Sequence, residues 1–289
     1  MGTDLNLENT RDRVIFMMIP GNPGNEGYYE EFGRCLLEKF GAPEALFYTV
    51  SHLNHVPLPV ELRRFESPSE HERFNLQEQV EHKLQFCRQF LPKKTPIFFF
   101  GHSIGAYMTL SVVPRLIADG FTISRAFALF PTVERMSESP NGRRLAKLLD
   151  FFDRNDWLTR LIAGSIECLP LVFKTSICRL NVGSSAPECV VSSAAELGFS
   201  TVIRNIIHMS NDELHTVCDF QEDLLKAGDA IHFYYGMKDG WCPLEYGVQM
   251  KERLGDKQVT IDKHGCQHAF VIGESEVMAE ELVQMIHSE

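Results

Sequence analysis

The chain has 289 residues, 44% of them apolar and 23% charged, so it is long enough for one large domain or two small ones and too apolar for a disordered protein. Its 39 acidic residues outnumber its 28 basic residues and give a net charge of −11. A nucleic-acid-binding protein needs a basic surface to neutralise phosphates, so this balance excludes that class. The first residues are polar and show no secretory signal. We therefore expect the eight cysteines to be reduced thiols in a protein that faces the cytosol.

Short apolar runs alternate with helical patterns along the chain. Runs that are apolar on both faces are typical of strands buried in a parallel sheet, and they are found at 14–19, 45–50, 97–100, 123–130, 231–235 and 258–261. Apolar residues at three- and four-residue spacing indicate helices with one buried face, and we expect helices over 76–91, 214–225, 244–254 and 277–286. This alternation predicts an α/β fold with a mostly parallel sheet covered by helices on both faces.

The segment 132–228 interrupts this alternation. It places roughly a hundred residues between two consecutive strands, which is far more than an ordinary crossover contains. The segment has helical patterns of its own. We interpret residues 1–289 as a single α/β domain with a helical cap inserted at about 132–228, over the carboxyl-terminal edge of the sheet.

The strand at 97–100 is followed by Gly101-His102-Ser103-Ile104-Gly105 and then by a helical pattern. A Gly-x-Ser-x-Gly sequence at a strand-to-helix turn forms a nucleophile elbow, whose strained backbone lifts the serine hydroxyl above the sheet. The glycines are needed because the strand and the helix pass too close for side chains. Ser103 is therefore the candidate nucleophile, and we expect His102 to support the site or line its pocket. Cys242 and Cys266 lack this context and are predicted to be packing residues.

A serine nucleophile needs a histidine base that is oriented by a carboxylate. In this architecture the three residues follow in the order Ser, Asp or Glu, His, with each partner in the loop after a strand. Asp239 lies where the chain leaves the strand 231–235, whereas Asp229 precedes that strand and falls at the wrong end of the sheet. The sequence therefore predicts Asp239 as the acid.

Two histidines, His264 and His268, follow the strand 258–261 and compete for the role of the base. The residues after His268 are Ala269-Phe270-Val271-Ile272, which can anchor the loop in the core and hold the imidazole. His264 lies nearer the strand end and can be an ordinary loop residue. We favour His268, which leaves room for one helix and one strand after the acid, as the fold requires.

A tetrahedral intermediate is stabilised by backbone N–H groups that point at its oxygen. Ile104 directly follows the candidate nucleophile and supplies one of these donors. The second is expected in the turn after the first apolar strand, Pro20-Gly21-Asn22-Pro23-Gly24, where glycines and prolines make a rigid turn with room for a ligand. We assign this second donor to the N–H of Asn22.

Several segments together resemble the lipid droplet-associated hydrolase family: 20–24, 101–105, 130–142, 234–239, 241–243 and 268–270. The likeness covers nearly the whole chain, and the long block at 130–142 is very specific. The resemblance implies the α/β-hydrolase fold, with Ser103 as nucleophile, Asp239 as acid and His268 as base. It also implies a serine hydrolase that acts on lipid esters, with sterol esters the substrate usually proposed, at lipid droplets and the endoplasmic reticulum.

The chain departs from this fold at its beginning. The oxyanion loop normally follows the third strand, but only about a dozen residues precede the corresponding strand here. We therefore expect the first N-terminal hairpin to be missing, because of a shorter isoform or a truncation. The strand at 45–50 would then form an exposed edge of the sheet.

The segment 157–180 is apolar and carries a tryptophan. Its apolar core, 161–173, is shorter than the ~20 residues that a membrane-spanning helix needs. Seven Lys and Arg residues against four Asp and Glu residues between 141 and 180 make the region locally cationic. These features suit a helix lying in a lipid surface, so we expect monotopic contact with a droplet or the endoplasmic reticulum. The contact residues would be Trp157, Leu161, Ile162, Leu171 and Phe173; the alternative is that they cover the pocket and pack inward.

The sequence thus predicts a carboxylic ester hydrolase that works through an acyl-enzyme, on the cytosolic face of lipid droplets and the endoplasmic reticulum. Its expected substrate is a lipid ester, a sterol ester above all, although a thioesterase would use the same triad. No metal or organic cofactor is implied. The alternative is a droplet-surface adhesion or scaffold protein with weak or vestigial hydrolase activity.

Overall fold

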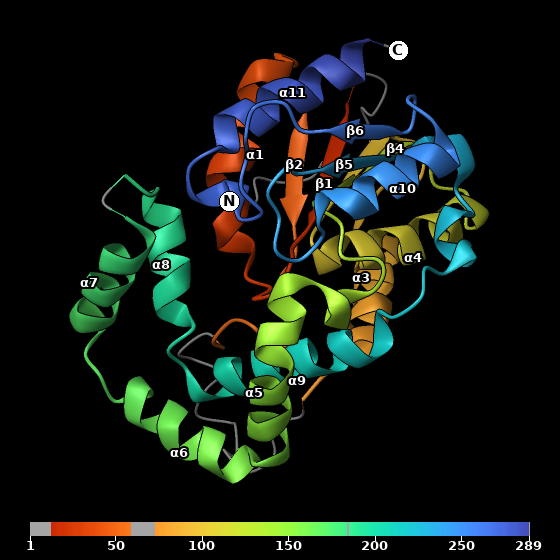
Figure 1. The fold of residues 1–289 in the computed structure, drawn as a ribbon. Coiled ribbons are helices and arrows are strands. Elements are labelled where there is room, and N and C mark those ends of the chain that lie inside the picture. Colours follow the sequence, from red (N-terminus) through yellow and green to blue (C-terminus); the bar gives the residue numbers. More distant parts are fainter. Residues whose placement is uncertain (1–12, 59–72, 184, 289) are drawn as a thin grey trace.

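A parallel sheet lies at the centre of the fold, with its strands in the order β2-β1-β3-β4-β5-β6 (Figure 1). The structure is a computed structural model that describes residues 13–58, 73–183 and 185–288. All neighbouring strands run parallel, which confirms the predicted sheet. Each strand begins and ends within two residues of a predicted apolar run: β1 (Ile15–Ile19), β2 (Leu46–Thr49), β3 (Ile97–His102), β4 (Ile123–Leu129), β5 (Ile231–Tyr235) and β6 (Val259–Ile261).

The two edges of the sheet are β2 and β6. The edge position of β2 agrees with the prediction for residues 45–50. The predicted absence of an N-terminal hairpin concerns residues 1–12, which lie outside the described residues.

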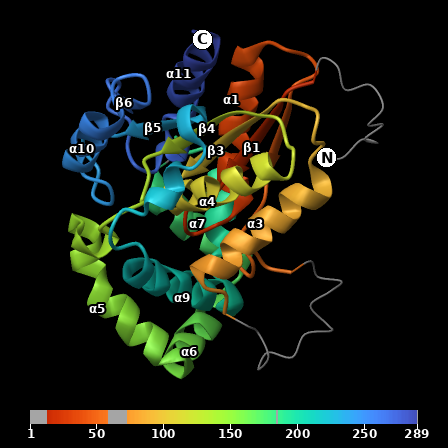
Figure 2. The same ribbon diagram turned by 90° about the vertical axis from the view of Figure 1, so that its right-hand side faces the viewer.

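Helices cover both faces of the sheet (Figures 1 and 2). On one face α1 (Glu30–Phe40), which follows the short helix η1 (Glu26–Tyr29), packs against α11 (Ser275–His287). On the other face lie α3 (Leu76–Phe90), α4 (Ile104–Ala118) and α10 (Leu244–Leu254). A right-handed crossover puts its helix on one face of the sheet when the chain moves one way across it, and on the other face when the chain moves the opposite way. The chain moves from β1 to β2 in one direction and from β3 to β4 in the other, so α1 and α4 lie on opposite faces.

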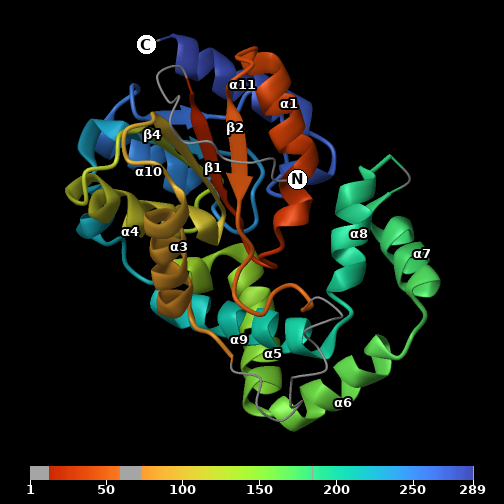
Figure 3. The same cartoon turned by 180° about the vertical axis from the view of Figure 1, so that it is seen from behind.

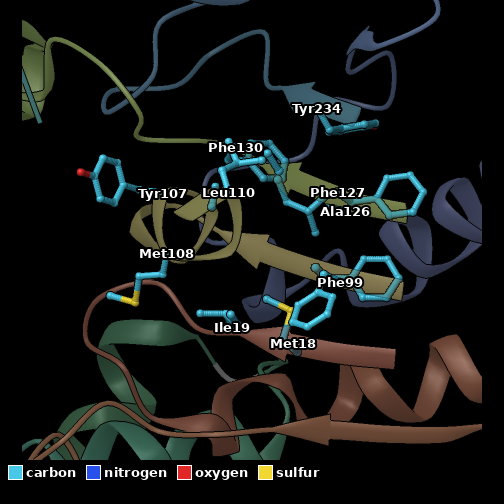
Figure 4. Close-up of a cluster of buried hydrophobic side chains, with 14 of the residues drawn as sticks. Met18, Ile19, Phe99, Tyr107, Met108, Leu110, Ala126, Phe127, Phe130 and Tyr234 are labelled. Atoms are coloured by element: carbon cyan, nitrogen blue, oxygen red, sulfur yellow. The ribbon is translucent and has the colours of Figure 1, made fainter. Parts of the chain in front are cut away.

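The strands are buried on both faces, so large apolar side chains fill the space between sheet and helices (Figure 4). Met18 of β1, Phe99 of β3 and Phe127 of β4 are fully buried. The rings of Phe100 and Phe127, on neighbouring strands, stack with their centroids 5.3 Å apart. This packing holds the ends of the strands in place, and the candidate site is built on those ends.

The chain between β4 and β5 forms a row of helices beyond the carboxyl-terminal ends of the strands (Figures 1 and 3). Within the described residues these helices are α5 (Pro140–Arg154), α6 (Asp156–Glu167), α7 (Leu171–Val182), α8 (Glu188–Glu196) and α9 (Ser200–Thr216). α9 packs against α3, α5 and α6, whereas α7 packs against α8, which in turn contacts η1. The row therefore touches the body of the fold through α9 and α8.

The predicted helix over 214–225 is wrong. α9 ends at Thr216, and only a short 3-10 helix, η3 (Glu222–Leu225), follows. The carbonyl groups of Val217 and Cys218 accept hydrogen bonds from the N–H groups of Met136 and Arg135, so the chain pairs with a distant segment where the helix would continue. Tertiary hydrogen bonds thus override the apolar spacing.

Candidate active site

The turn between β3 and α4 has the geometry of a nucleophile elbow. Ser103 has φ 55° and ψ −123°, a strained conformation that non-glycine residues rarely adopt. A side-chain carbon on Gly105 would lie 2.2 Å from the carbonyl oxygen of Ile19, and one on Gly101 would lie 2.4 Å from the carbonyl of Gly105. Both glycines are therefore required by the close approach of β1, β3 and α4, as predicted.

The loops after β5 and β6 bring two side chains to Ser103. His268, which precedes the short helix η5 (Phe270–Ile272), has its Nε2 2.9 Å from Ser103 Oγ and its Nδ1 2.6 Å from Asp239 Oδ2. Because a carboxylate only accepts, Nδ1 carries the proton, and Nε2 of the neutral ring accepts from the serine hydroxyl. His264 is exposed and turns away, with its Nε2 3.1 Å from Glu281 Oε2. Of the two candidate histidines, the structure brings only His268 to Ser103.

The carboxyl group of Asp239 is buried and richly hydrogen-bonded. Its Oδ1 accepts from the N–H groups of Trp241 at 2.7 Å and Cys242 at 3.1 Å, and its Oδ2 accepts from the Cys242 thiol at 3.1 Å. Burial alone would raise the pKa of Asp239, but the hydrogen bonds from His268, Cys242 and Trp241 hold it below its ordinary value. Asp239 is therefore an ionised acceptor facing His268.

Cys242 is fully buried in the core, as expected of a packing residue, and it also has a role in the site that the sequence did not predict. Its thiol donates to the carboxylate that faces His268, and burial beside that carboxylate raises the pKa of the thiol well above its usual value. The ligand atoms of Asp239, Cys242 and His268 lie within 4.8 Å of one another, a spacing that a metal ion could use. A metal ion there would have to break the 2.6 Å bond between His268 and Asp239.

A chain of buried hydrogen bonds connects the expected oxyanion loop to the histidine loop. The N–H of Gly21 donates to the Tyr29 hydroxyl at 2.9 Å, and that hydroxyl lies 2.7 Å from Nδ1 of His102. Nε2 of His102 lies 2.7 Å from the carbonyl oxygen of His268 and must donate to it. The hydroxyl of Tyr29 therefore donates to Nδ1. Burial lowers the pKa of His102 to about 3, so the ring stays neutral and acts as a support, as predicted.

Tyr29→Phe is expected to lower the free energy of unfolding by about 1–3 kcal/mol, because it leaves the buried N–H of Gly21 and Nδ1 of His102 unpaired. Urea denaturation measures this change. Tyr28→Phe is the matched control, since the Tyr28 hydroxyl makes no hydrogen bond with a described residue. Equal urea midpoints for the two variants would show that the chain of hydrogen bonds contributes nothing to stability.

The two residues predicted to supply oxyanion donors both lie near Ser103: Ile104 follows it in the chain, and Asn22 lines the same cavity. Ile104 begins α4, whose amino-terminal end carries a partial positive charge, and Asn22 lies in the turn after β1. Neither N–H group has a hydrogen-bond partner among the described residues, so both are free to bind an oxygen atom. The loop of Asn22 approaches Ser103 closely: a side-chain carbon on neighbouring Gly21 would lie 2.9 Å from Ser103 Cβ.

Two residues that the sequence did not single out hold the side chain of Asn22. Its Nδ2 donates to Ser210 Oγ at 2.8 Å and to Glu213 Oε1 at 3.0 Å, both on α9. Burial raises the pKa of Glu213 to about 8, and the bond from Asn22 opposes that rise. No local pattern marks these contacts, because Asn22 and its partners are separated by 188 and 191 residues.

Ser103 and His268 open onto a cavity of about 470 Å³, which lies within the usual range for small-molecule sites. Trp241, Glu213 and the turn at Gly21–Pro23 form part of its wall. Besides Ser210 of α9, the other lining side chains from α8, the turn after it, α9 and the loop after β6 are apolar: Val190, Ala194, Leu197, Ile206, Ala269, Val271 and Ile272. The cavity is suited to a molecule that is mostly hydrocarbon.

The five residues predicted to contact lipid are all exposed, which excludes the alternative that they pack inward. Their exposed fractions are 67% for Trp157, 62% for Leu161, 44% for Ile162, 65% for Leu171 and 62% for Phe173. We call the exposed apolar side chains of α6 and α7 the α6–α7 surface. No single described helix is long and apolar enough to cross a membrane; α6 and α7 reach that length and apolarity only as a pair bent by 103°.

The positive charge of this region is partly neutralised in the structure. Arg154 pairs with Asp150 at 2.7 Å, and Arg160 pairs with Asp156 at 2.9 Å. The remaining excess of positive charge lies on α5. Its residues Arg143, Arg144 and Lys147 are exposed and form no ion pair with a described residue.

Comparison with known proteins agrees with this geometry. A family model described as lipid-droplet associated hydrolase matches residues 12–271. The lipid droplet-associated hydrolase of Gallus gallus is 31% identical over 284 residues, covering 96% of this chain and 86% of the relative. The Homo sapiens protein of the same name is 29% identical over 277 residues, covering 93% and 83%.

Solved structures with a similar fold are more distant in sequence. A peroxisomal α/β-hydrolase from Saccharomyces cerevisiae superposes with a TM-score of 0.60 at 13% identity, covering 96% of this chain and 77% of the other. A bromoperoxidase from Bacillus anthracis superposes with a TM-score of 0.59 at 14% identity, covering 96% and 92%. From these matches, this chain has the α/β-hydrolase fold and belongs to the lipid droplet-associated hydrolase family.

Proposed function

We propose that the protein is a serine ester hydrolase that acts on lipid esters through Ser103, His268 and Asp239. The observation that carries this proposal is the pair of hydrogen bonds made by His268, at 2.9 Å to Ser103 and 2.6 Å to Asp239, in a cavity with apolar walls. A serine hydroxyl is activated when a neutral histidine accepts its proton and a carboxylate stabilises the imidazolium that forms.

The reaction has two steps. Ser103 Oγ attacks the ester carbonyl carbon while its proton passes to His268 Nε2, and the N–H groups of Ile104 and Asn22 bind the resulting oxyanion. His268 then gives the proton to the leaving alcohol, and an acyl-enzyme remains. In the second step His268 takes a proton from water, whose oxygen attacks the acyl carbon. The bond between that carbon and Ser103 Oγ then breaks, His268 returns the proton to Oγ, and the carboxylic acid leaves. Asp239 keeps the ring in the required tautomer throughout.

The substrate class follows from the cavity and the family. We assign the site to lipid esters, with a sterol ester as the first substrate to test, because the lining is apolar and the relatives are named for lipid droplets. The helices between β4 and β5 act as a cap over the cavity, since α8 and α9 supply part of its wall. The protein would work on the cytosolic face of droplets and the endoplasmic reticulum.

The α6–α7 surface is proposed as the lipid-contacting part of this cap. Its exposed side chains include Trp157 and Phe173, and exposed cations lie nearby on α5. A large exposed apolar patch marks a site that meets another molecule, and an apolar helix face beside cations suits a lipid surface.

A fluorophosphonate probe tests the nucleophile directly. We expect the probe to label the wild-type protein and not Ser103→Ala, because only an activated serine reacts with it. Hydrolysis of sterol, glycerol and short-chain esters, presented on droplets and in solution, then ranks the substrates. Equal labelling of wild type and Ser103→Ala, or no labelling of either, would contradict the proposal.

A droplet-surface adhesion or scaffold role is the second candidate, and the extent of the α6–α7 surface favours it. The two functions can be distinguished by the droplet phenotypes of cells that express Ser103→Ala in place of the wild-type protein. Droplet phenotypes that persist in this variant indicate a role that does not need hydrolysis, whereas phenotypes that vanish indicate the enzyme.

A further inference from the structure

A second hollow lies behind the wall of the catalytic cavity. It has a volume of about 260 Å³ and is lined by residues of α6, α7, α8 and the beginning of α9. Figure 3 shows these helices in the outer row. We call it the α7–α8 groove. Apart from Lys174, the residues that line it are apolar or small: Ile166, Leu169, Ile177, Cys178, Ala194, Ala195, Leu197, Gly198 and Ile203.

The groove and the catalytic cavity share two lining residues. Ala194 and Leu197 contribute to both hollows. The wall between the catalytic cavity and the groove is therefore thin at these two residues, and the side chain of Ala194 is only a methyl group. A hydrocarbon chain that passes Ala194 would run from one hollow into the other.

Lys174 is the only charged side chain among the described residues that line the groove, and its ammonium group contacts the turn between α8 and α9. Lys174 is buried, and its Nζ lies 3.5 Å from the carbonyl oxygen of Gly198 and 4.8 Å from the centre of the Phe199 ring. Because Gly198 also lines the groove, these contacts keep the ammonium group at the end of the groove next to the turn between α8 and α9. The other residues that line the groove are apolar or small and offer no charged partner to a ligand.

The groove is open to solvent, because its lining residues Leu169 and Ile177 are 42% and 51% exposed. α7, which forms one side of it, buries little of its own surface. Lys174 is its only buried residue, while Val172 and Leu180 are 75% and 85% exposed. The groove therefore extends from the wall of the catalytic cavity to the α6–α7 surface, to which its lining residues Ile166 and Ile177 also belong. This open side gives a lipid molecule a way in.

We propose that the α7–α8 groove binds the distal part of a long acyl chain whose ester carbon lies at Ser103, and that the chain passes Ala194 and Leu197 to reach it. This inference rests on the proposed function, since it needs an ester at Ser103. The catalytic cavity must also hold the ester group and the alcohol, so a long chain gains from a second apolar compartment. Each methylene that leaves water for such a compartment strengthens binding about fourfold.

Substitutions that fill the groove from two sides test this assignment. Ala195→Phe on α8 and Cys178→Phe on α7 affect residues that line only the groove, and exposed Ser192→Phe on α8 is the matched control. The measurement is the ratio of kcat/KM for p-nitrophenyl palmitate to that for p-nitrophenyl butyrate in detergent micelles. We expect this ratio to fall at least about tenfold in both groove variants, because several methylenes lose their site, and to stay within twofold in Ser192→Phe. A ratio that is unchanged in the groove variants, or that falls equally in the control, overturns the proposal.

A second measurement uses the wild-type protein and does not depend on how the variants fold. A long-chain fluorophosphonate with a diazirine at the end of its chain is attached to Ser103 and then irradiated. Cross-links to Ile166 or Ile177 support the assignment, and cross-links confined to Val271 and Ile272, or to no protein residue, overturn it. Failure of the probe to attach to Ser103 is a different result, because it contradicts the proposed function itself.

Discussion

Asp239→Asn is expected to lower kcat for ester hydrolysis by about 10⁴-fold, while leaving the fold intact. The carboxylate now accepts a hydrogen bond from His268 Nδ1–H at 2.6 Å, which leaves Nε2 unprotonated and able to take the proton of Ser103. An asparagine amide can donate to Nδ1 and so favours the tautomer with its proton on Nε2. In that tautomer His268 cannot act as the base.

The measurement is steady-state turnover of a soluble short-chain ester, together with the rate of fluorophosphonate labelling. Asp229→Asn is the matched control, because Asp229 is an exposed aspartate at the opposite end of β5. It makes the same chemical change just before the strand that Asp239 follows, and it should leave kcat within twofold. A kcat for Asp239→Asn within tenfold of wild type would remove Asp239 from the catalytic machinery.

Replacing Leu161, Ile162, Leu171 and Phe173 together with Asp is expected to weaken binding to lipid droplets by at least ~10³-fold. Full burial of such a side chain in an apolar phase contributes roughly 1.5–3 kcal/mol, and every 1.4 kcal/mol is tenfold in a binding constant. Because all four side chains are exposed, the aspartates remain in water and leave the core unchanged. Turnover of a soluble ester should therefore persist.

Flotation with artificial droplets of triolein coated with phosphatidylcholine measures this binding. The matched control replaces four exposed apolar residues of other helices with Asp: Phe90, Ile117, Val248 and Val277. This control adds the same charge away from the α6–α7 surface and should float like the wild type. If the control detaches to the same extent, net charge and not this surface governs binding; unchanged flotation of the first variant rejects the surface as the lipid contact.

The elbow and the order of the acid and the base could be read from the sequence because they follow from local chain chemistry. Buried parallel strands must be apolar on both faces, and tight turns at their ends need glycine, so β3 and the turn at Ser103 are visible as a pattern. Because β5 and β6 run parallel, the loops that follow them lie at the same edge of the sheet. Asp239 and His268 could therefore be named before their contacts were known.

The extent of α9 and the role of the exposed helices could not be read in this way. An apolar spacing shows that a helix has an apolar face, but it does not show what covers that face. The segment after Thr216 bonds to Arg135 and Met136 instead of continuing the helix, and the apolar residues of α6 and α7 remain uncovered. Both outcomes depend on neighbours that are distant in sequence.

By itself the sequence determined the parallel sheet, the strained serine and the order of the acid and the base, because periodicity, glycine and handedness act along a short stretch of chain. Only the tertiary structure showed that His268 contacts Ser103 while His264 turns to Glu281, brought the thiol of Cys242 to the carboxylate and joined Tyr29 to His102. It also placed the α7–α8 groove behind the catalytic cavity. These features rest on hydrogen bonds and contacts of a few ångströms between segments far apart in the chain, and such contacts leave no periodic trace in the sequence.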